Sequence, residues 1–257
     1  MRDSGSAVDN SRSTPPNDAG NRVGIYNEGQ TCFLASVLIA FSHIKELTTF
    51  VSKNIRENSF ALLYHQSIIQ INEGNGFIPK DLRCALHEYS ENKELFLYHN
   101  IQQDASEALM AIINIFSEQS GCYKDFMTSL FGFYVQNILK CGNCERLSDK
   151  TELYLTLEVP MLVRENDYQL LLGNYFKPEI MSEGNEPQCV GCGEKSPGGT
   201  KQLKLASDPE IVILVLKRYT YHLDKVPPKP TKIKRFIKFP LEGLILNPIG
   251  VNPAQYG

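Results

Sequence analysis

The chain has 257 residues, of which 42% are hydrophobic and 21% are charged, and its formal net charge is −3 at pH 7. This length suits one large domain or two small ones, and the hydrophobic fraction is enough for a sizeable core. The weak net charge argues against a chain that as a whole binds nucleic acid or a membrane surface.

The N-terminal segment 1–22 is rich in Ser, Asn, Asp, Pro and Gly and has no apolar stretch after the initial methionine. Such a segment buries little surface, so we expect a disordered tail over 1–22 and no secretory signal. The longest apolar runs, 33–41 and 211–216, are too short to cross a bilayer. We therefore expect a soluble protein of the cytoplasm or nucleus, in which the seven cysteines are reduced.

Helical spacing dominates the first half of the chain after this tail. Apolar residues recur at intervals of three and four, which predicts helices over roughly 32–43, 60–71, 81–89 and 104–116. The sequence "NEGNG" at 72–76 predicts a turn that ends the second of these helices.

Strand patterns dominate the second half. Apolar residues alternate over 131–139 and 153–159, and the uninterrupted run "IVILVL" at 211–216 is typical of a central strand. A further strand is predicted over 233–239, closed by Pro240, after a surface loop over 225–232. Because helices come first and strands second, the sequence favours an α+β fold over a doubly wound sheet.

Two Cys-x-x-Cys pairs lie far apart in the sequence: "CGNC" holds Cys141 and Cys144, and "CVGC" holds Cys189 and Cys192. Each pair contains a glycine, which lets the backbone turn tightly enough to aim both sulfurs at one point. Four thiolates around one tetrahedral ion make a closed structural zinc site, which holds a fold and performs no chemistry. Two independent buried or disulfide-bonded pairs remain an alternative. A thioredoxin-like role is disfavoured because no βαβ pattern surrounds either pair.

Another cysteine, Cys32, stands where a polar stretch meets the apolar run of the first predicted helix. The positive end of the helix dipole and the unpaired backbone N–H groups there favour a thiolate, which is the nucleophilic form. Asn27, a short distance upstream, offers a side-chain amide that can stabilise a developing oxyanion. The alternative is that Cys32 only packs in the core, since buried cysteine is common.

The stretch "VGIYNEGQTCFLASVL" around Cys32 resembles the cysteine box of the ubiquitin-specific proteases, whose general form is Gly-Leu-x-Asn-x-Gly-x-Thr-Cys-Tyr-Met-Asn-Ser. The matching positions are Gly24, Asn27, Gly29, Thr31, Cys32 and Ser36. The chain departs from the pattern at Ala35, which replaces the usual asparagine. Further family landmarks follow in order: "IQQDASEAL" is similar to the glutamine box, and the two cysteine pairs, "LKRYTY" and "IKFPLEGLILNP" come after it. The resemblance covers about Val23 to Pro248.

This resemblance implies a papain-like cysteine protease fold of the α+β class, with a helical thumb, a β palm and zinc-stabilised β fingers over about 131–216. The catalytic domain would occupy 23–257 and would lack the C-terminal part of the palm. Cys32 would attack the carbonyl of the C-terminal glycine of ubiquitin and form a thioester, while Asn27 would help to stabilise the oxyanion. The implied partners are ubiquitin and ubiquitinated proteins, and the implied cofactor is one structural zinc ion, Zn2+.

The resemblance also implies that Gln102, Asp104 and Glu107 lie beside the channel that receives the basic tail of ubiquitin. The spacing of Asp104 and Glu107 is equally that of a helix capping box. The two carboxylates therefore have a purely local alternative role at the start of their helix, and the two roles are compatible.

In this family the catalytic base is a histidine in a Gly-His-Tyr context near the C-terminal end of the domain, oriented by an Asp or Asn further on. The histidines here are His43, His65, His87, His99 and His222, and none has that context. These 257 residues thus contain the nucleophile without a recognisable base, so little or no turnover is expected. Three hypotheses remain: a fragment, truncation or isoform of an active deubiquitinase, a catalytically inactive ubiquitin-binding module, and an unrelated zinc-stabilised scaffold.

Overall fold

The structure, a computed structural model, describes residues 24–55, 60–93, 103–161, 166–181, 184, 186–222 and 229–246. The chain forms two compact units, residues 1–116 and 117–257. The tail expected over 1–22 lies outside the described residues, and so do Gln102 and His99.

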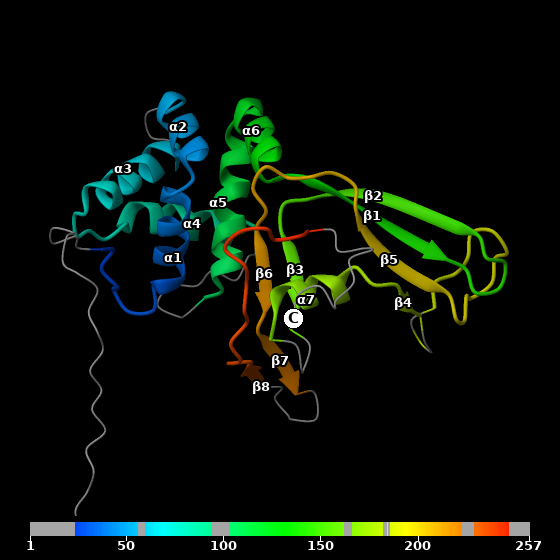
Figure 1. Ribbon diagram of the computed structural model, residues 1–257. Coiled ribbons are helices and arrows are strands. Elements are labelled where there is room, and N and C mark those ends of the chain that lie inside the picture. Colours follow the sequence, from blue (N-terminus) through cyan, green and yellow to red (C-terminus); the bar gives the residue numbers. More distant parts are fainter. Residues whose placement is uncertain are drawn as a thin grey trace, which may run out of the picture. The chain divides into compact units, whose positions relative to one another are not determined.

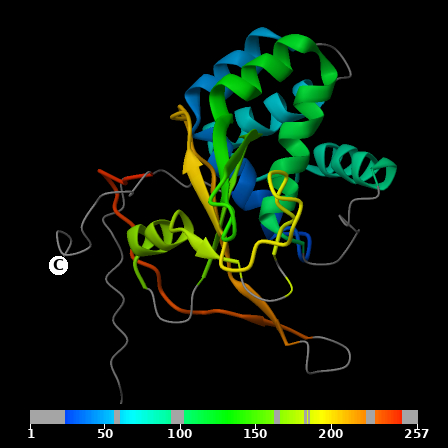
Figure 2. The ribbon, with the colours of Figure 1, turned by 90° about the vertical axis from the view of Figure 1, so that its right-hand side faces the viewer.

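The first unit is a group of helices (Figure 1 and Figure 2). They are α1 (Cys32–Ser42), α2 (Lys45–Lys53), α3 (Phe60–Glu73), α4 (Lys80–Asn92) and α5 (Ala105–Gln119), the last of which continues past the boundary. Helix α3 packs against α1, α2 and α4. Phe116 of α5 meets Phe60 and Tyr64 of α3 edge to face, with ring centroids 5.3 and 5.2 Å apart. Burial of these apolar faces is the main source of stability for such short helices.

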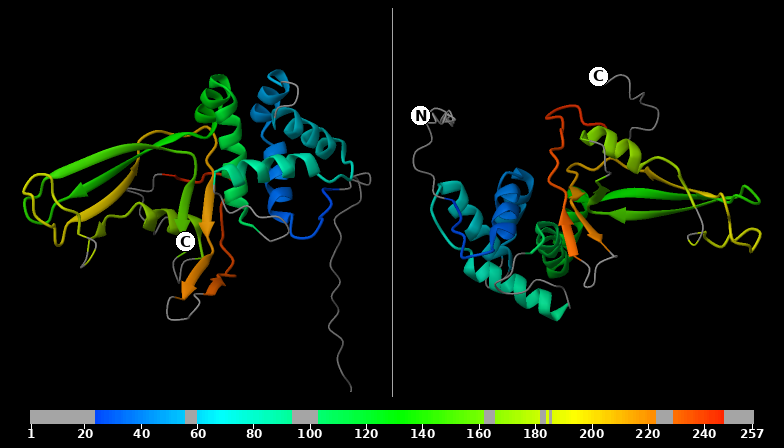
Figure 3. Two further views of the ribbon diagram at one scale, coloured as in Figure 1. Left: turned by 180° about the vertical axis from the view of Figure 1, so that it is seen from behind. Right: turned by 90° about the horizontal axis from the view of Figure 1, so that it is seen from below.

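The second unit is built mainly on strands. Its elements are α6 (Gly121–Phe131), β1 (Phe133–Lys140), β2 (Leu147–Tyr154), β3 (Leu157–Pro160), α7 (Tyr168–Tyr175), β4 (Glu179–Ile180), β5 (Thr200–Leu205), β6 (Leu214–Lys217), β7 (Tyr219–His222) and β8 (Lys229–Lys232). One sheet has the strand order β2-β1-β5-β4, and β1 pairs antiparallel with both β2 and β5. Figure 1 and Figure 3 show this sheet as a long ribbon, at whose tip the β1–β2 turn and the loop before β5 lie side by side.

Two smaller sheets accompany the ribbon: β3 pairs parallel with β6, and β7 pairs antiparallel with β8. The core of this unit joins one end of β1 to β3 and α7. Its buried side chains are Phe133, Val135, Leu157, Val159, Met161, Tyr168, Leu171, Leu172, Phe176 and Ile237. Asp167 fixes the start of α7, because its Oδ1 accepts hydrogen bonds from the backbone N–H groups of Gln169 and Leu170 at 2.8 and 3.3 Å.

The α+β class is confirmed, and each of the four predicted helices is present, with ends shifted by a few residues. Helices α2, α6 and α7 were not predicted. The strand expected from 131 begins only at Phe133, because α6 occupies the residues before it. The strand expected over 153–159 is two strands, since β2 ends at Tyr154 and β3 begins at Leu157.

Two strand predictions and one loop prediction in the last part of the chain were wrong. The run 211–216 is not a central strand, since β6 covers only Leu214–Lys217 and belongs to a two-stranded sheet. The segment 233–239 forms no strand. Among the described residues, its β-type pairing is one isolated bridge between Lys238 and Asp167. The loop expected over 225–232 is partly strand β8, and 225–228 lie outside the described residues.

Within the described ranges, no single helix is long and apolar enough to cross a membrane. Helices α1 and α2 pass that test only when taken together, and they are bent by 88° where they meet.

Candidate functional site

Cys32 is the first residue of α1, and its side chain is exposed. At 3.6 residues per turn, Cys32 points to the side of α1 opposite its buried face, which consists of Leu34, Val37, Leu38 and Phe41. The burial of that face therefore holds the thiol outward. The structure does not support the alternative in which Cys32 is a core residue.

The loop before α1 holds the side chain of Asn27 in place. Its Oδ1 accepts two hydrogen bonds from Thr31, one from the backbone N–H and one from the hydroxyl, both at 3.0 Å. These bonds occupy the oxygen of the amide and leave the two N–H donors of Nδ2 for a ligand. Asn27 is exposed, so its amide is accessible from solvent.

Asp104 and Glu107 have different surroundings at the start of α5. Asp104 caps the helix, because its Oδ1 accepts from the backbone N–H and the hydroxyl of Ser106, both at 2.8 Å. Glu107 is exposed, and its pKa is raised above the ordinary value, first by partial burial and then by the charge of Asp104. The local capping role is thus real for Asp104, and it leaves the carboxylate of Glu107 available to a ligand.

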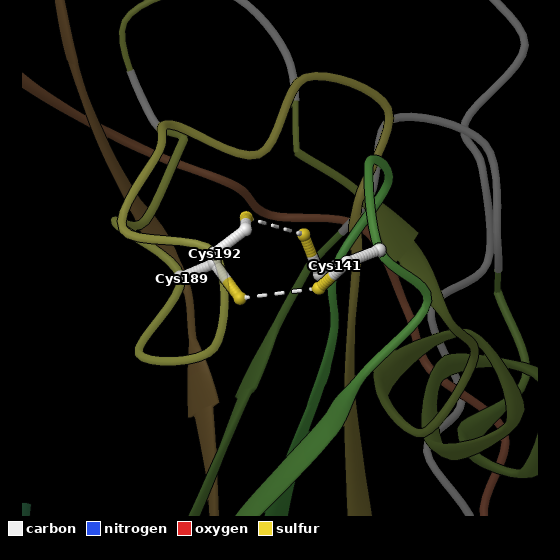
Figure 4. Close-up of side chains that lie close together, drawn as sticks. Cys141, Cys189 and Cys192 are labelled. Carbon is white, nitrogen blue, oxygen red and sulfur yellow. Dashed lines mark hydrogen bonds between the residues drawn. The ribbon is translucent and has the colours of Figure 1, made fainter.

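The four cysteines of the two Cys-x-x-Cys pairs meet at one point, and Figure 4 labels Cys141, Cys189 and Cys192 of this group. All four Sγ atoms lie within 4.8 Å of one another. The Sγ atoms of Cys141 and Cys192 are 4.0 Å apart, and those of Cys144 and Cys189 are 3.7 Å apart. A disulfide would bring two sulfurs to about 2 Å. A tetrahedral zinc ion with bonds of about 2.3 Å would instead place its sulfurs about 3.8 Å apart. The cluster therefore has the dimensions of a metal site.

The two cysteine pairs have the same backbone geometry. In the first, the N–H of Glu145 donates to the carbonyl of Cys141 at 3.1 Å, and Glu145 has a φ of 54°. In the second, the N–H of Gly193 donates to the carbonyl of Cys189 at 2.8 Å, and Gly193 has a φ of 73°. Each pair is therefore a tight knuckle that ends in a left-handed residue, and the two knuckles face each other.

Hydrogen-bond donors lie next to the sulfurs of Cys141 and Cys189 and favour their thiolate forms, which bind cations. The backbone N–H groups of Asn143 and Gly191 point at the sulfurs of Cys141 and Cys189, at 3.4 and 3.3 Å. Hydrogen bonds from the Ser196 hydroxyl and from backbone N–H groups lower the pKa of Cys141 to about 6, and backbone N–H groups also lower the pKa of Cys189. The neighbouring sulfurs and burial raise the pKa of Cys144 and Cys192. A group that is partly thiolate near neutral pH is a ready metal ligand, so the donor set fits zinc.

Ser196 and Asn143 also join the two knuckles, and no sequence pattern pointed to either residue. The Oγ of Ser196 accepts from the N–H of Gly142 at 2.8 Å, and the Nδ2 of Asn143 donates to the carbonyl of Lys195 at 2.9 Å. Partners of this kind orient metal ligands. A serine and an asparagine near cysteines are too common to be singled out from sequence.

Two of the five histidines contact residues of their own helices. His43 caps the far end of α1, about 16 Å along the helix from Cys32, and its Nδ1 lies 2.8 Å from the carbonyl of Ile39. His87 on α4 pairs with Glu91 at 3.5 Å. His99 and the side chain of His222 lie outside the described part.

The model of one protein family, described as "Ubiquitin carboxyl-terminal hydrolase", matches residues 23–254. Among curated proteins, the chain is 27% identical over 213 residues to "Ubl carboxyl-terminal hydrolase 18" of Mus musculus, which covers 77% of this chain and 56% of that protein. It is also 27% identical over 248 residues to "Ubiquitin carboxyl-terminal hydrolase 23" of Arabidopsis thaliana, which covers 86% of this chain and 28% of that protein. The chain thus spans about half or less of the length of these relatives.

Among solved structures, the chain is similar to one titled "Structure of the SAGA Ubp8/Sgf11/Sus1/Sgf73 DUB module bound to ubiquitin aldehyde". The TM-score is 0.68 at 20% identity, over 88% of this chain and 54% of that one. This likeness shows a shared fold. Since the family model matches nearly the whole chain and the fold agrees with it, the chain belongs to the ubiquitin carboxyl-terminal hydrolase family, with the fold of a ubiquitin-specific protease catalytic domain.

Proposed function

We propose that this chain is the catalytic domain of a thiol-dependent deubiquitinase, with Cys32 as the nucleophile. The Cys32 thiolate attacks the carbonyl carbon of the C-terminal glycine of ubiquitin, the bond to the conjugated amine breaks, the amine takes a proton from water as it leaves, and a thioester remains. Water then hydrolyses the thioester and regenerates the thiol. The observation that carries the proposal is the exposed thiol at the N-terminus of α1, directly after a loop with a fixed side-chain amide.

In this proposal Asn27 stabilises the oxyanion of the tetrahedral intermediate. Its Oδ1 is occupied by Thr31, so the Nδ2 donors are preorganised before a substrate arrives. Loss of one such donor typically lowers kcat by about 10² to 10³.

Gln102, Asp104 and Glu107 are proposed to bind the basic tail of ubiquitin, because two carboxylates at one helix start attract positive charge. A test must keep the capping role of Asp104. The double variant Asp104→Ser, Glu107→Gln does so, since serine is also a good N-cap. Calorimetric titration with ubiquitin is expected to show weaker binding by the variant, and equal affinity would show that these carboxylates act only locally.

The base is not assigned to any of the five histidines, so we propose that the 257-residue chain turns over ubiquitin conjugates slowly or not at all. Without an imidazole, nothing keeps the thiol ionised during attack and nothing protonates the departing amine. Loss of such a base lowers rates by about 10³ or more.

The test uses ubiquitin with a C-terminal vinyl methyl ester, which needs only a thiolate and a fit. The wild-type chain is expected to form a covalent adduct at Cys32, and Cys32→Ala is expected to abolish it. Cys84→Ala and Cys122→Ala are matched controls, because both cysteines are also exposed. Labelling that persists in Cys32→Ala would overturn the assignment of the nucleophile.

A catalytically inactive ubiquitin-binding module is the second candidate, favoured because none of the five histidines stands in the Gly-His-Tyr context of the family's base. The two candidate functions differ in whether the chain forms the covalent adduct at Cys32. An inactive module would bind ubiquitin in the calorimeter but would not react with the vinyl ester. A deubiquitinase domain would bind ubiquitin and would also form the covalent adduct.

We further propose that the four-cysteine cluster binds one structural zinc ion, supported by the distances between its sulfurs. Elemental analysis is expected to find one zinc per chain in the wild type and less in Cys189→Ser. A zinc-free wild type, or an unchanged content in the variant, would contradict this.

A further inference from the structure

The loop that carries Asn27 has an unusual backbone. Gly29 and Gln30 are consecutive left-handed residues, with φ of 72° and 55°. Glycine adopts this region freely, but a residue with a side chain does so uncommonly and at a cost in free energy. Gln30 therefore keeps its conformation only if contacts elsewhere hold the loop.

The loop is attached to the segment that leads into α4. The backbone N–H of Tyr26 donates to the carbonyl of Phe77 at 2.9 Å, and Ile25 forms a parallel bridge with the same residue. At the other end of the loop, Oε2 of Glu28 lies 3.0 Å from Nη2 of Arg83, in the first turn of α4. These contacts lie on both sides of Asn27 in the sequence.

The ion pair between Glu28 and Arg83 is partly sheltered, with side-chain exposures of 34% and 26%. Glu28 and Arg83 line one small cavity together with Ile25, Tyr26, Thr31, Leu34, Ile78 and Pro79. The Nε of Arg83 is buried and has no hydrogen-bond partner among the described residues, so the charge of Arg83 is balanced mainly through the contact with Glu28. An ion pair of this kind contributes little to overall stability, but the planar guanidinium of Arg83 presents its donors in fixed directions.

We propose that the Glu28–Arg83 ion pair is a positioning device for the reaction at Cys32, an inference that rests on the proposed function. The pair ties the loop 24–31 to α4 and so holds the Asn27 amide in a fixed place relative to the start of α1. Glu28 and Arg83 touch neither the substrate nor the thiol in this proposal. They act through Asn27, whose own hydrogen bonds to Thr31 join its side chain to the N-cap residue of α1 but do not hold the loop against α4.

Two measurements on the full chain test this. The first is hydrogen–deuterium exchange of the peptide over 24–31, which requires no activity. The second is the second-order rate of labelling of Cys32 by ubiquitin C-terminal aldehyde, whose hemithioacetal places an oxygen where the oxyanion would form, compared with the rate of alkylation by iodoacetamide. The variants are Glu28→Gln, Arg83→Lys and the charge swap Glu28→Arg, Arg83→Glu. Glu91→Gln is the matched control, because it removes a carboxylate that pairs on the same helix.

We expect Glu28→Gln to speed exchange over 24–31 without changing exchange in α3. Ubiquitin labelling is expected to slow about tenfold, less than the loss from removing an oxyanion donor outright, while iodoacetamide reacts at the wild-type rate. The charge swap is expected to recover part of the labelling, which a merely destabilised fold would not do. Arg83→Lys is expected to fall between the wild type and Glu28→Gln, since lysine keeps the charge and loses the fork.

Unchanged exchange in Glu28→Gln would overturn the proposal, and so would faster exchange with unchanged labelling. If the wild type does not react with the ubiquitin probe, the proposed function fails instead, and the exchange data still decide whether the ion pair fixes the loop. A control variant Glu91→Gln that behaves like Glu28→Gln would also count against the proposal, because the effect would then belong to charge in general.

Discussion

Folding disfavours the charged form of the Glu107 side chain. Its pKa is raised by partial burial and by Asp104, so the folded state binds the proton more tightly than the unfolded state does. The stability that depends on this group is present at low pH and is lost as pH rises through the raised pKa. A residue that is kept for function often costs stability, so a neutral polar replacement at such a position can stabilise the fold.

We therefore expect Glu107→Gln to raise the thermal midpoint slightly at pH 7. The difference should vanish below the ordinary pKa of glutamate, where both side chains are neutral. Thermal unfolding followed by circular dichroism between pH 3 and pH 8 measures this, with Glu118→Gln at the other end of α5 as the control. A variant less stable than the wild type at pH 7 would show that Glu107 is held by a favourable contact.

Tyr64 offers a second test at a single residue. Its ring is fully buried against Phe116, and its hydroxyl has no hydrogen-bond partner among the described residues. An unpaired buried hydroxyl costs about 1–3 kcal/mol, so Tyr64→Phe is expected to raise the free energy of unfolding by about 1 kcal/mol. Phe116→Ala, which empties the same contact, should lower it by about 3–5 kcal/mol. Urea unfolding of both variants measures these changes, and a destabilised Tyr64→Phe would reveal a partner for the hydroxyl.

At the scale of elements, the first knuckle depends on a glycine for space. A Cβ on Gly142 would run into the backbone carbonyl of Pro197 and the backbone N–H of Gly199, and neither can move aside cheaply. Gly142→Ala is therefore expected to push the two knuckles apart and weaken zinc binding. Gly173→Ala in α7 is the matched control, since a Cβ there meets nothing. Competition with a chromogenic zinc chelator compares the affinities, and equal values for the two variants would contradict the packing argument.

The elements that the sequence predicts are those with a long periodic face. Helix α6 has such a face, since its buried residues Tyr123, Met127 and Leu130 are spaced four and three apart, yet the alternation of Phe131, Phe133 and Val135 masked it. Helix α2 buries only Leu47 and Val51, too few for a recognisable period. Short helices of this kind are decided by tertiary contacts that no local pattern records.

The segment 233–239 shows why a strand pattern is not a strand. Its burial alternates as expected, with Ile233 and Ile237 turned inward and Lys234 and Phe236 exposed. A strand also needs a neighbour with which to share a continuous ladder of hydrogen bonds. This segment has separate backbone contacts near its two ends, the hydrogen bond from Ile233 to Arg218 and the bridge at Lys238. Pairing partners lie far away in sequence, so side-chain period alone cannot supply them.

The residues of the candidate site also fall into those that the sequence predicts and those that it does not. Cys32 at a helix start and four cysteines in two knuckles are recognisable because the needed geometry is local to each motif. Arg83, Ser196 and Asn143 are not, because their roles arise only when distant parts of the chain meet. Sequence thus predicts the groups that perform chemistry better than the groups that hold them in place.

At the scale of the whole molecule, two compact units predict two separable stabilities. The helices of the first unit are held by apolar packing, for example around Phe116. In the second unit, one knuckle closes the turn between β1 and β2, and the other lies shortly before β5. A metal held by both knuckles would join all three strands at the tip of the sheet.

Removal of zinc should therefore loosen one unit and spare the other. Metal binding free energy is available only to the folded site, so chelation lowers the stability of the elements that the site joins. We expect dipicolinate to speed hydrogen–deuterium exchange in β1, β2 and β5, most strongly near the knuckles, and added zinc to reverse the change. Exchange in α1, α3 and α4 should stay within error of the untreated protein. Parallel loss of protection in those helices would show that the chain unfolds as one cooperative body, and unchanged exchange in the strands would show that the cysteine cluster holds the sheet without a metal.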